Sequence, residues 1–105
     1  MTNLLFICSG AIDRSPCAAS LFDDSKYYSA KYAGIGPLTE NPVTKELIEW
    51  SDKIFVMEFE HKVMLFEQFS EAREKEIDVL GISNDYLRFD LKLEKILKKK
   101  LNKFI

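Results

Sequence analysis

Four short apolar runs, separated by turn residues, stand out along the chain. They cover residues 3–8, 27–34, 52–58 and 76–82. Runs of this length that are rich in apolar and aromatic residues are typical of strands. The run at 52–58, DKIFVME, is the most continuous of the four. It predicts a central strand of a parallel sheet, buried on both faces.

Apolar residues at helical spacing follow the first two runs. Ala18, Leu21 and Phe22 begin the stripe of a first helix. After the loop GIGPLTENP, we expect Asn41 to cap a second helix, with Pro42 at its first position. The apolar face of this second helix would consist of Val43, Leu47 and Trp50.

Two more helices are expected in the second half of the chain. One has an apolar face formed by Phe59, Val63 and Phe66. The other follows the loop SNDYLRF, is capped by Asp90, and has a stripe made of Leu93, Ile96 or Leu97, Leu101 and Phe104. The alternation of strands and helices predicts a three-layer α/β/α sandwich around a four-stranded parallel sheet. We expect one domain, residues 1–105.

The composition agrees with one globular domain, and the charged residues are distributed unevenly along the chain. The 105 residues are 47% hydrophobic and 30% charged, with a net charge of -2. Residues 91–105 contain six lysines and one glutamate, which leaves nine basic and sixteen acidic residues in the rest of the chain. Nucleic acid is therefore not an expected partner, because binding it needs a continuous basic surface. The terminal lysines are read as the solvated face of a helix.

The first residues, MTNLLFICSG, lack the basic start of a signal peptide, and no apolar stretch is long enough to span a membrane. We therefore expect a cytoplasmic protein without a membrane partner. Two cysteines, Cys8 and Cys17, are too few for a disulfide framework, and a reducing compartment keeps a functional thiol available. Cys17 lies near the apolar stripe of the first helix and is read as a small core residue.

The sequence CSGAIDRSP, residues 8–16, joins the first strand to the first helix. Backbone N–H groups of such a turn converge on an anion, and the helix N-terminus adds partial positive charge. Gly10 permits a tight backbone, Ser15 is expected as N-cap, and Pro16 fits the first helical position. Cys8 would be favoured as a thiolate in this field, and Arg14 offers a planar fork for two phosphate oxygens. The pattern predicts a phosphate-binding loop with a nucleophile.

Three stretches carry a family resemblance. LLFICSGAIDRSPCAASLF, YAGIGPLTENPVTKEL and SDKIFVMEFEHK resemble the low-molecular-weight protein tyrosine phosphatase family, particularly a short bacterial form of it. The resemblance implies that Cys8 attacks phosphorus to form a cysteinyl-phosphate, that Arg14 binds the transferred group, and that the Ser15 hydroxyl stabilises the leaving thiolate. No cofactor and no metal are expected. The residues that surround the substrate phosphate would be Ser9, Gly10, Ala11, Ile12, Asp13 and Arg14.

The loop departs from the family pattern at two positions. Ala11 stands where asparagine is common, and Asp13 stands where a second cysteine is frequent. A carboxylate that faced the thiolate would disfavour it and would repel a phosphate dianion. We therefore expect Asp13 to point away from the bound anion.

The general acid is assigned by the same resemblance. The family places an aspartate, followed by proline and an aromatic residue, on a loop near the C-terminus, where this chain has ISNDYLRFD. Aligned on Tyr86, the usual aspartate position holds Asn84, so Asp85 is the expected proton donor and Asp90 a more distant candidate. Tyr86 would line the entrance and stack on an aromatic leaving group.

Three functions fit these residues. The first is a phosphomonoesterase for phosphotyrosine proteins or small aryl phosphates, which would also bind free phosphate or sulfate. The second is a catalytically weak module that binds a phosphorylated partner. The third is an arsenate reductase, which is disfavoured because no cysteine follows Cys17. His61, the single histidine, lies in EFEHK and is expected to be exposed. The oligomeric state is left open.

Overall fold

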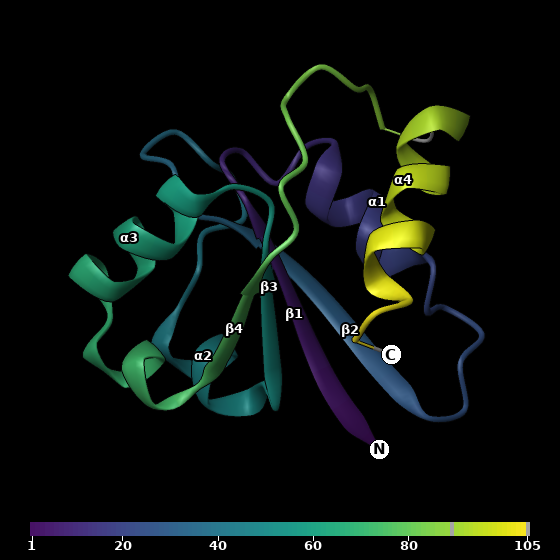
Figure 1. Ribbon diagram of the computed structural model, residues 1–105. Helices are drawn as coiled ribbons and strands as arrows, with labels where there is room; N and C mark the ends of the chain where they lie inside the picture. Colours follow the sequence, from purple (N-terminus) through teal and green to yellow (C-terminus); the bar gives the residue numbers. More distant parts are fainter. Residues whose placement is uncertain (89, 105) are drawn as a thin grey trace.

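The computed structural model describes residues 1–88 and 90–104, and its core is one four-stranded parallel sheet (Figure 1). The strand order is β2-β1-β3-β4. The strands are β1 Thr2–Cys8, β2 Tyr28–Gly34, β3 Lys53–Val56 and β4 Glu76–Val79. The helices are α1 Arg14–Ser20, α2 Lys45–Trp50, α3 Phe59–Gln68, the short 3-10 helix η1 Ser70–Glu74 and α4 Leu91–Leu101. The predicted sheet is confirmed.

Helices cover both faces of the sheet, so the three-layer prediction is also confirmed. Helices α1 and α4 lie on one face, and α2 and α3 lie on the other (Figure 1). Alternate residues of β1 enter the two cores, with Leu4 and Phe6 under α1 and α4 and Leu5 and Ile7 on the opposite face. Such two-sided burial explains why the central strands are continuously apolar.

The prediction for the start of α2 is wrong. Thr44, and not Asn41, caps the helix, and its side chain accepts from the Leu47 N–H over 3.1 Å. The Asn41 amide instead donates to the Tyr32 carbonyl oxygen over 2.7 Å, and Pro42 forms a bridge with Gly34. Asn41 and Pro42 therefore extend the edge of the sheet, because tertiary partners satisfy their polar groups better than a helix terminus would.

The predicted face of α3 is also wrong. Phe59 is 66% exposed, whereas the buried residues of α3 are His61 and Leu65. By contrast, the cap of α4 is confirmed, since the Asp90 carboxylate accepts from the Lys92 N–H. The stripe is confirmed within the helix, where the buried residues are Leu93, Leu97 and Leu101, whereas Phe104 lies beyond α4 and is 36% exposed.

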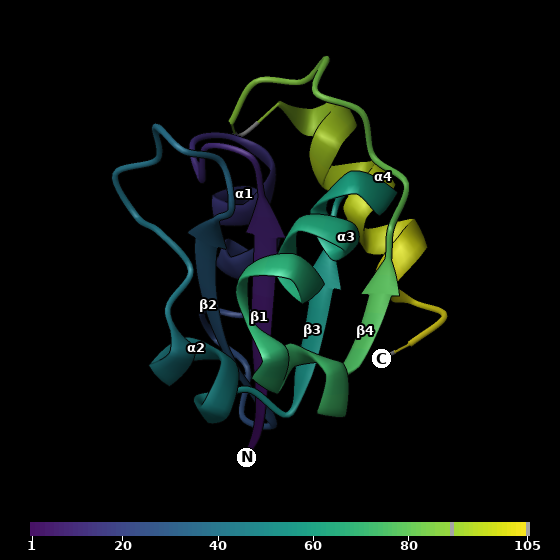
Figure 2. The same cartoon turned by 90° about the vertical axis from the view of Figure 1, so that its left-hand side faces the viewer.

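All four strands end at the same edge of the sheet, as Figure 2 shows at its upper side. The chain leaves β1 toward β2 on one side, whereas β3 and β4 extend the sheet on the other side. The carboxyl end of β1 is therefore the topological switch point, where ligands of open α/β sheets bind. Three segments gather there: the 9–13 turn, the 35–43 loop and the 80–88 segment (Figure 2). Within the described residues, no helix is long and apolar enough to cross a membrane.

Candidate active site

Cys8 is the last residue of β1, and its sulfur receives two polar contacts. The Ala11 N–H donates to Sγ over 3.2 Å, and the Ser15 hydroxyl oxygen lies 3.0 Å from Sγ. The side chain is buried, at 3% exposure. Either the sulfur or the Ser15 oxygen can be the donor of their contact, whereas the Ala11 N–H can only donate. The loop therefore directs at least one hydrogen-bond donor at the sulfur.

The position of Ser15 corrects a prediction about α1. The helix begins one residue earlier, at Arg14, with Asp13 in the cap position and no side-chain cap bond. Ser15 is therefore not the N-cap, and Pro16 is not the first helical residue. The Ser15 hydroxyl lies instead between Cys8 Sγ and the Ala33 carbonyl oxygen, 3.5 Å away. The Ser15 hydroxyl thus contacts the Cys8 sulfur and does not make the expected capping bond to the helix backbone.

Arg14 is held in a fixed orientation although it is charged and only 2% exposed. Its Nη1 donates to the Ile82 carbonyl oxygen over 2.8 Å and lies 3.2 Å from Glu58 Oε1. Both contacts are made by one nitrogen, and a guanidinium carries five N–H donors on three nitrogens. The ion pair with Glu58 offsets part of the cost of burying the charge. The remaining nitrogens can meet an anion.

The loop backbone is shaped by contacts with the 35–43 loop. The Ser9 carbonyl oxygen accepts from the Gly36 N–H over 2.8 Å, and the Gly10 carbonyl oxygen accepts from the Thr39 hydroxyl over 2.9 Å. Because a trans peptide directs its C=O and N–H to opposite sides, carbonyls held outward turn the next N–H groups inward. The Ala11 N–H that faces the Cys8 sulfur is one of these.

Two glycines permit this close approach. A Cβ on Gly34 would lie 2.8 Å from the Ser9 carbonyl oxygen, and one on Gly36 would lie 2.9 Å from the same atom. Real Cβ atoms essentially never come closer than 3.0 Å to such a neighbour. The close packing of the 35–43 loop against Ser9 therefore requires glycine at positions 34 and 36.

Ala11 carries the backbone strain of the loop. Its φ is 60°, in the left-handed region that glycine and asparagine occupy more readily. The strain costs on the order of 1–2 kcal/mol for a residue with a Cβ. The turn nevertheless aims the Ala11 N–H at Cys8, so the observed loop shape does not require asparagine at this position.

The segment from residue 82 to residue 88 is hydrogen-bonded at both of its ends to the loop between β1 and α1. Arg14 bonds to the carbonyl oxygen of Ile82, and Asp13 Oδ1 accepts from the Arg88 N–H over 2.8 Å. The Asp13 carboxylate is thus engaged by this segment. Asp85 lies between the two attachments, is exposed, and accepts from the Ser83 hydroxyl over 2.9 Å.

The other two residues singled out in this region have packing or capping contacts. Tyr86 is half-buried and packs against the core under α1 and α4, where it also borders a hollow with Ile82 and Lys99. Asp90 is engaged as the N-cap of α4. Asp90 therefore has a structural role in capping α4, and the role of Asp85 as proton donor remains a prediction.

His61 belongs to the site although the sequence suggested an exposed position. Its side chain is 2% exposed, and Nε2 lies 2.9 Å from the Ser9 hydroxyl oxygen. Nδ1 accepts from the Glu58 N–H over 3.1 Å. Burial lowers the pKa of His61 below the ordinary 6.5, and Arg14 lowers it further while Glu58 opposes them. Because Ser9 lies 52 positions away, no local signal in the sequence indicates this contact.

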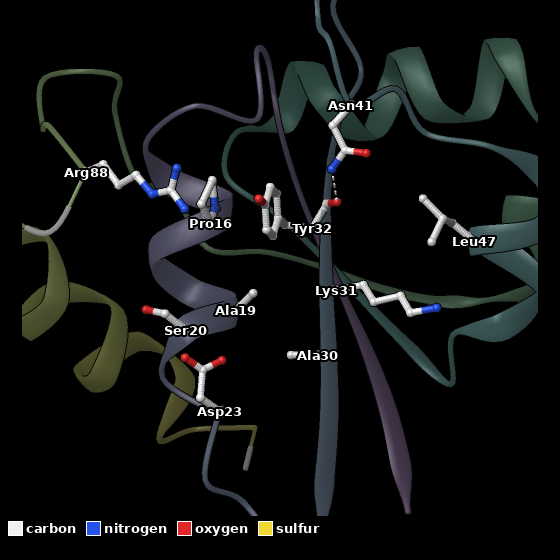
Figure 3. Close-up of a pocket in the computed structure, with 10 residues that line it drawn as sticks. All are labelled: Pro16, Ala19, Ser20, Asp23, Ala30, Lys31, Tyr32, Asn41, Leu47 and Arg88. Carbon is white, nitrogen blue, oxygen red and sulfur yellow. Dashed lines mark hydrogen bonds between the residues drawn. The ribbon is translucent and has the colours of Figure 1, made fainter.

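Two hollows near the loop share some of their lining residues. One, of about 500 Å³, runs between α1 and β2 and is bordered by Pro16, Tyr32 and Arg88 (Figure 3). The other, of about 550 Å³, is lined by Gly10, Ala11, Ile12, Tyr32, Leu38, Glu40, Asn41 and Arg88. Tyr32, Asn41 and Arg88 line both. The second hollow touches the loop directly and is the better candidate for the substrate side of the site.

Cys17 and possible metal ligands add no second centre. Cys17 is buried in the core under α1 and α4, in the position expected for a small core residue. Within residues 1–88 and 90–104, no group of three His, Cys, Asp or Glu side chains is placed to hold a metal ion.

Comparison with known proteins places this geometry in a known fold. SP-PTP, the low molecular weight protein tyrosine phosphatase from Streptococcus pyogenes, superposes with a TM-score of 0.79 at 15% identity, covering 100% of this chain and 94% of that chain. The tyrosine phosphatase Wzb from Escherichia coli K30, in complex with phosphate, gives 0.77 at 22% identity, covering 97% and 94%. The YwlE arginine phosphatase from Geobacillus stearothermophilus gives 0.74 at 22% identity, covering 99% and 93%.

No protein-family model and no curated protein matches the sequence. The structural similarity nevertheless extends over nearly the whole chain. The chain therefore has the fold of the low molecular weight protein tyrosine phosphatases, as its sequence predicted.

Proposed function

We propose that the chain is a phosphomonoester hydrolase of the protein tyrosine phosphatase type, with Cys8 as nucleophile. The observation that carries this proposal is the environment of the Cys8 sulfur at the N-terminus of α1, where it accepts from the Ala11 N–H and lies 3.0 Å from the Ser15 hydroxyl oxygen. Buried Arg14 in the same loop supplies the positive charge that a phosphate needs. The similar solved structures include one that holds phosphate.

The reaction would proceed in two displacements at phosphorus. Cys8 Sγ attacks, so that an S–P bond forms while the bond to the leaving oxygen breaks and Asp85 protonates that oxygen. Water then attacks phosphorus and gives its proton to the Asp85 carboxylate. The S–P bond breaks, and the Ser15 hydroxyl stabilises the released thiolate by donating to it over the short distance now seen. Phosphate leaves, and each group returns to its starting state.

Arg14 and the loop backbone stabilise the transferred phosphoryl group. Its three equatorial oxygens carry charge in the transition state, and fixed donors act there without reorganisation. The contacts of Arg14 with Ile82 and Glu58 pre-orient the guanidinium for this task. The electrostatic part of the mechanism thus uses side chains that the fold already holds.

The second hollow supports an aryl or protein substrate. Ile12 and Leu38, which are 67% and 94% exposed, form apolar walls next to the loop. Such walls suit the ring of a phosphotyrosine better than a strongly hydrated alkyl phosphate.

A reducing compartment keeps the Cys8 thiol available, so we place the protein in the cytoplasm.

Steady-state hydrolysis of an aryl phosphate, a phosphotyrosine peptide and a phosphoarginine peptide tests the proposal. The phosphoarginine arm is included because one structure of this fold is an arginine phosphatase. We expect aryl phosphate hydrolysis that falls by at least about a thousandfold in Cys8→Ala, as for removal of other nucleophiles. Cys17→Ala is the matched control and should retain activity, because Cys17 lies in the core.

Phosphate binding without turnover would contradict the proposal and would instead identify a phosphate-binding module. Turnover of phosphoarginine alone would keep the Cys8 chemistry and replace the substrate class.

A further inference from the structure

His61 connects three parts of the site through a continuous set of contacts. Its Nε2 lies 2.9 Å from the Ser9 hydroxyl oxygen, one residue after the nucleophile position. Its Nδ1 accepts from the Glu58 N–H, and the Glu58 carboxylate lies 3.2 Å from Arg14 Nη1. The imidazole therefore lies between the first turn of the loop and the partner of its arginine.

The contacts assign the tautomer of the ring. A backbone N–H can only donate, so Nδ1 must accept the Glu58 bond and carry no proton. The proton of neutral His61 is then on Nε2, which donates to the Ser9 hydroxyl. The Ser9 carbonyl oxygen is held on another side by the Gly36 N–H. Ser9 is thus fixed through both its side chain and its backbone.

We propose that His61 is a positioning residue whose neutral form, with the proton on Nε2, holds the Cys8–Ser15 loop in its anion-binding shape, and that its protonation releases the loop. The inference deepens the proposed function and rests on it, since it names what controls that same loop.

Protonation would oppose two of the observed contacts. A second proton on Nδ1 would face the Glu58 N–H, so two donors would meet where a donor and an acceptor now meet. The charged ring would also attract the Glu58 carboxylate, whose Oε2 already lies 3.9 Å from Nε2. That attraction would weaken the hydrogen bond between His61 and Ser9. It would also weaken the ion pair between Glu58 and Arg14. Both ends of the anion site would therefore be affected.

Burial, helped by the charge of Arg14, favours the neutral ring in the folded protein. Arg14 from α1 and Glu58 from the turn before α3 act on it, and burial together with Arg14 outweighs Glu58. The result is a pKa below 6.5. The neutral, loop-holding form is accordingly the main one at neutral pH.

Substitutions at this position can separate the two ring contacts. The amide nitrogen of glutamine falls near Nε2 and can donate to Ser9, whereas the shorter asparagine falls near Nδ1 and can reach only Glu58. Glu60→Gln changes an exposed residue of the same helix and is the matched control. The set therefore tests the Ser9 contact and not only the integrity of α3.

The probe is sulfate, which stays a dianion from pH 5 to 8 and avoids the titration of phosphate itself. Binding is measured by calorimetry in a Cys8→Ser background, which removes ionisation of the thiol. At pH 7.5 we expect His61→Asn to weaken sulfate binding roughly three- to tenfold, the effect of one hydrogen bond, while His61→Gln and Glu60→Gln stay within about twofold of the background. Between pH 7.5 and 5 the background should lose affinity and His61→Gln should lose less.

The protonation state is read directly because the chain has a single histidine. In ¹⁵N spectra we expect the Nε2–H tautomer at pH 7.5, with ring titration at the same pH at which sulfate affinity falls. Equal affinity and equal pH dependence in His61→Asn and the background, with folded spectra, would overturn the role of His61 alone. Absence of sulfate binding in every variant, wild type included, would overturn the phosphate loop and with it this inference.

Discussion

Arg14 Nη1 donates to the carbonyl oxygen of Ile82 over 2.8 Å, although the two residues are 68 positions apart in the chain. The bond attaches the arginine of the loop to the segment that follows β4. Asp13 makes a second attachment to the same segment through the Arg88 N–H. The segment that contains Asp85, the expected proton donor, is therefore held to the loop that follows Cys8.

Arg14→Lys should weaken anion binding and turnover although it keeps the positive charge. Lysine lacks the planar fork and cannot hold Ile82 and Glu58 while meeting a phosphate. We expect kcat/KM for an aryl phosphate to fall roughly 10- to 100-fold, the effect of losing charged hydrogen bonds. Sulfate titration of the same variant checks whether the loss is in binding. Unchanged affinity and rate would show that Arg14 does not contact the anion.

Asp85→Asn should slow poor leaving groups much more than good ones. A good leaving group departs without a proton, whereas an alkyl phosphate needs an acid, so we expect a loss of roughly 10²- to 10⁴-fold only for the latter. Rates across a series of aryl and alkyl phosphates measure this dependence. Equal losses across the series would remove Asp85 from the acid role.

Asp90→Asn is the matched test for the other carboxylate. Asp90 caps α4 through the Lys92 N–H, and asparagine is also a good cap. We expect Asp90→Asn to leave both stability and the leaving-group dependence nearly unchanged, while Asp90→Ala lowers the free energy of unfolding by about 1 kcal/mol. Urea unfolding measures the first effect and the phosphate series the second. A steeper leaving-group dependence in Asp90→Asn would assign the acid to Asp90.

Ala11→Gly should stabilise the protein. Ala11 has φ 60°, where a Cβ is strained and glycine is not. After the larger entropy loss of glycine on folding is included, we expect a gain of about 0.5–1 kcal/mol. The free energy of unfolding in urea measures it. A loss of stability would mean that the loop relaxes away from this conformation.

Stability should fall as the pH drops through about 6.5 because of His61. The pKa of His61 is lowered in the native state, so the unfolded chain binds a proton at a higher pH than the native protein does. Binding that proton stabilises the unfolded state and lowers the free energy of unfolding. The contribution is fully present above 6.5 and is lost between 6.5 and the lower native value. The difference in urea unfolding between wild type and His61→Gln, measured from pH 8 to 5, isolates it from the carboxylates. A constant difference over this range would contradict the assignment.

The sequence predicted those parts of the structure that depend on local pattern. The apolar run of β1 and the turn that follows it place Cys8 at the end of a strand. The cap of α4 follows from Asp90, and its buried face follows from leucines that recur at helical spacing. Each of these signals lies within a few residues of the feature it predicts, so neighbouring segments did not alter the outcome.

Features set by contacts between distant segments were not predictable in this way. Asn41 has the chemistry of a cap, but the Tyr32 carbonyl oxygen takes its amide, so the helix begins later. His61 was expected to be exposed because its neighbours in sequence are charged. Its Nε2 is instead hydrogen-bonded to the hydroxyl of Ser9, 52 positions away. Thr39 was not singled out, although its hydroxyl holds the Gly10 carbonyl oxygen. Such partners become visible only once the sheet brings the strand ends together.

The central claim is that Cys8 forms a covalent bond to phosphorus, and rapid mixing with an aryl phosphate tests it directly. The reaction is quenched in acid, and the protein is examined for phosphate on Cys8 in wild type and in Cys8→Ala, since a serine at this position could itself accept phosphate. We predict a burst of product of about one equivalent, with phosphate on Cys8 that is absent from the variant. Turnover without phosphate on the protein, or turnover that persists in Cys8→Ala, would contradict the account.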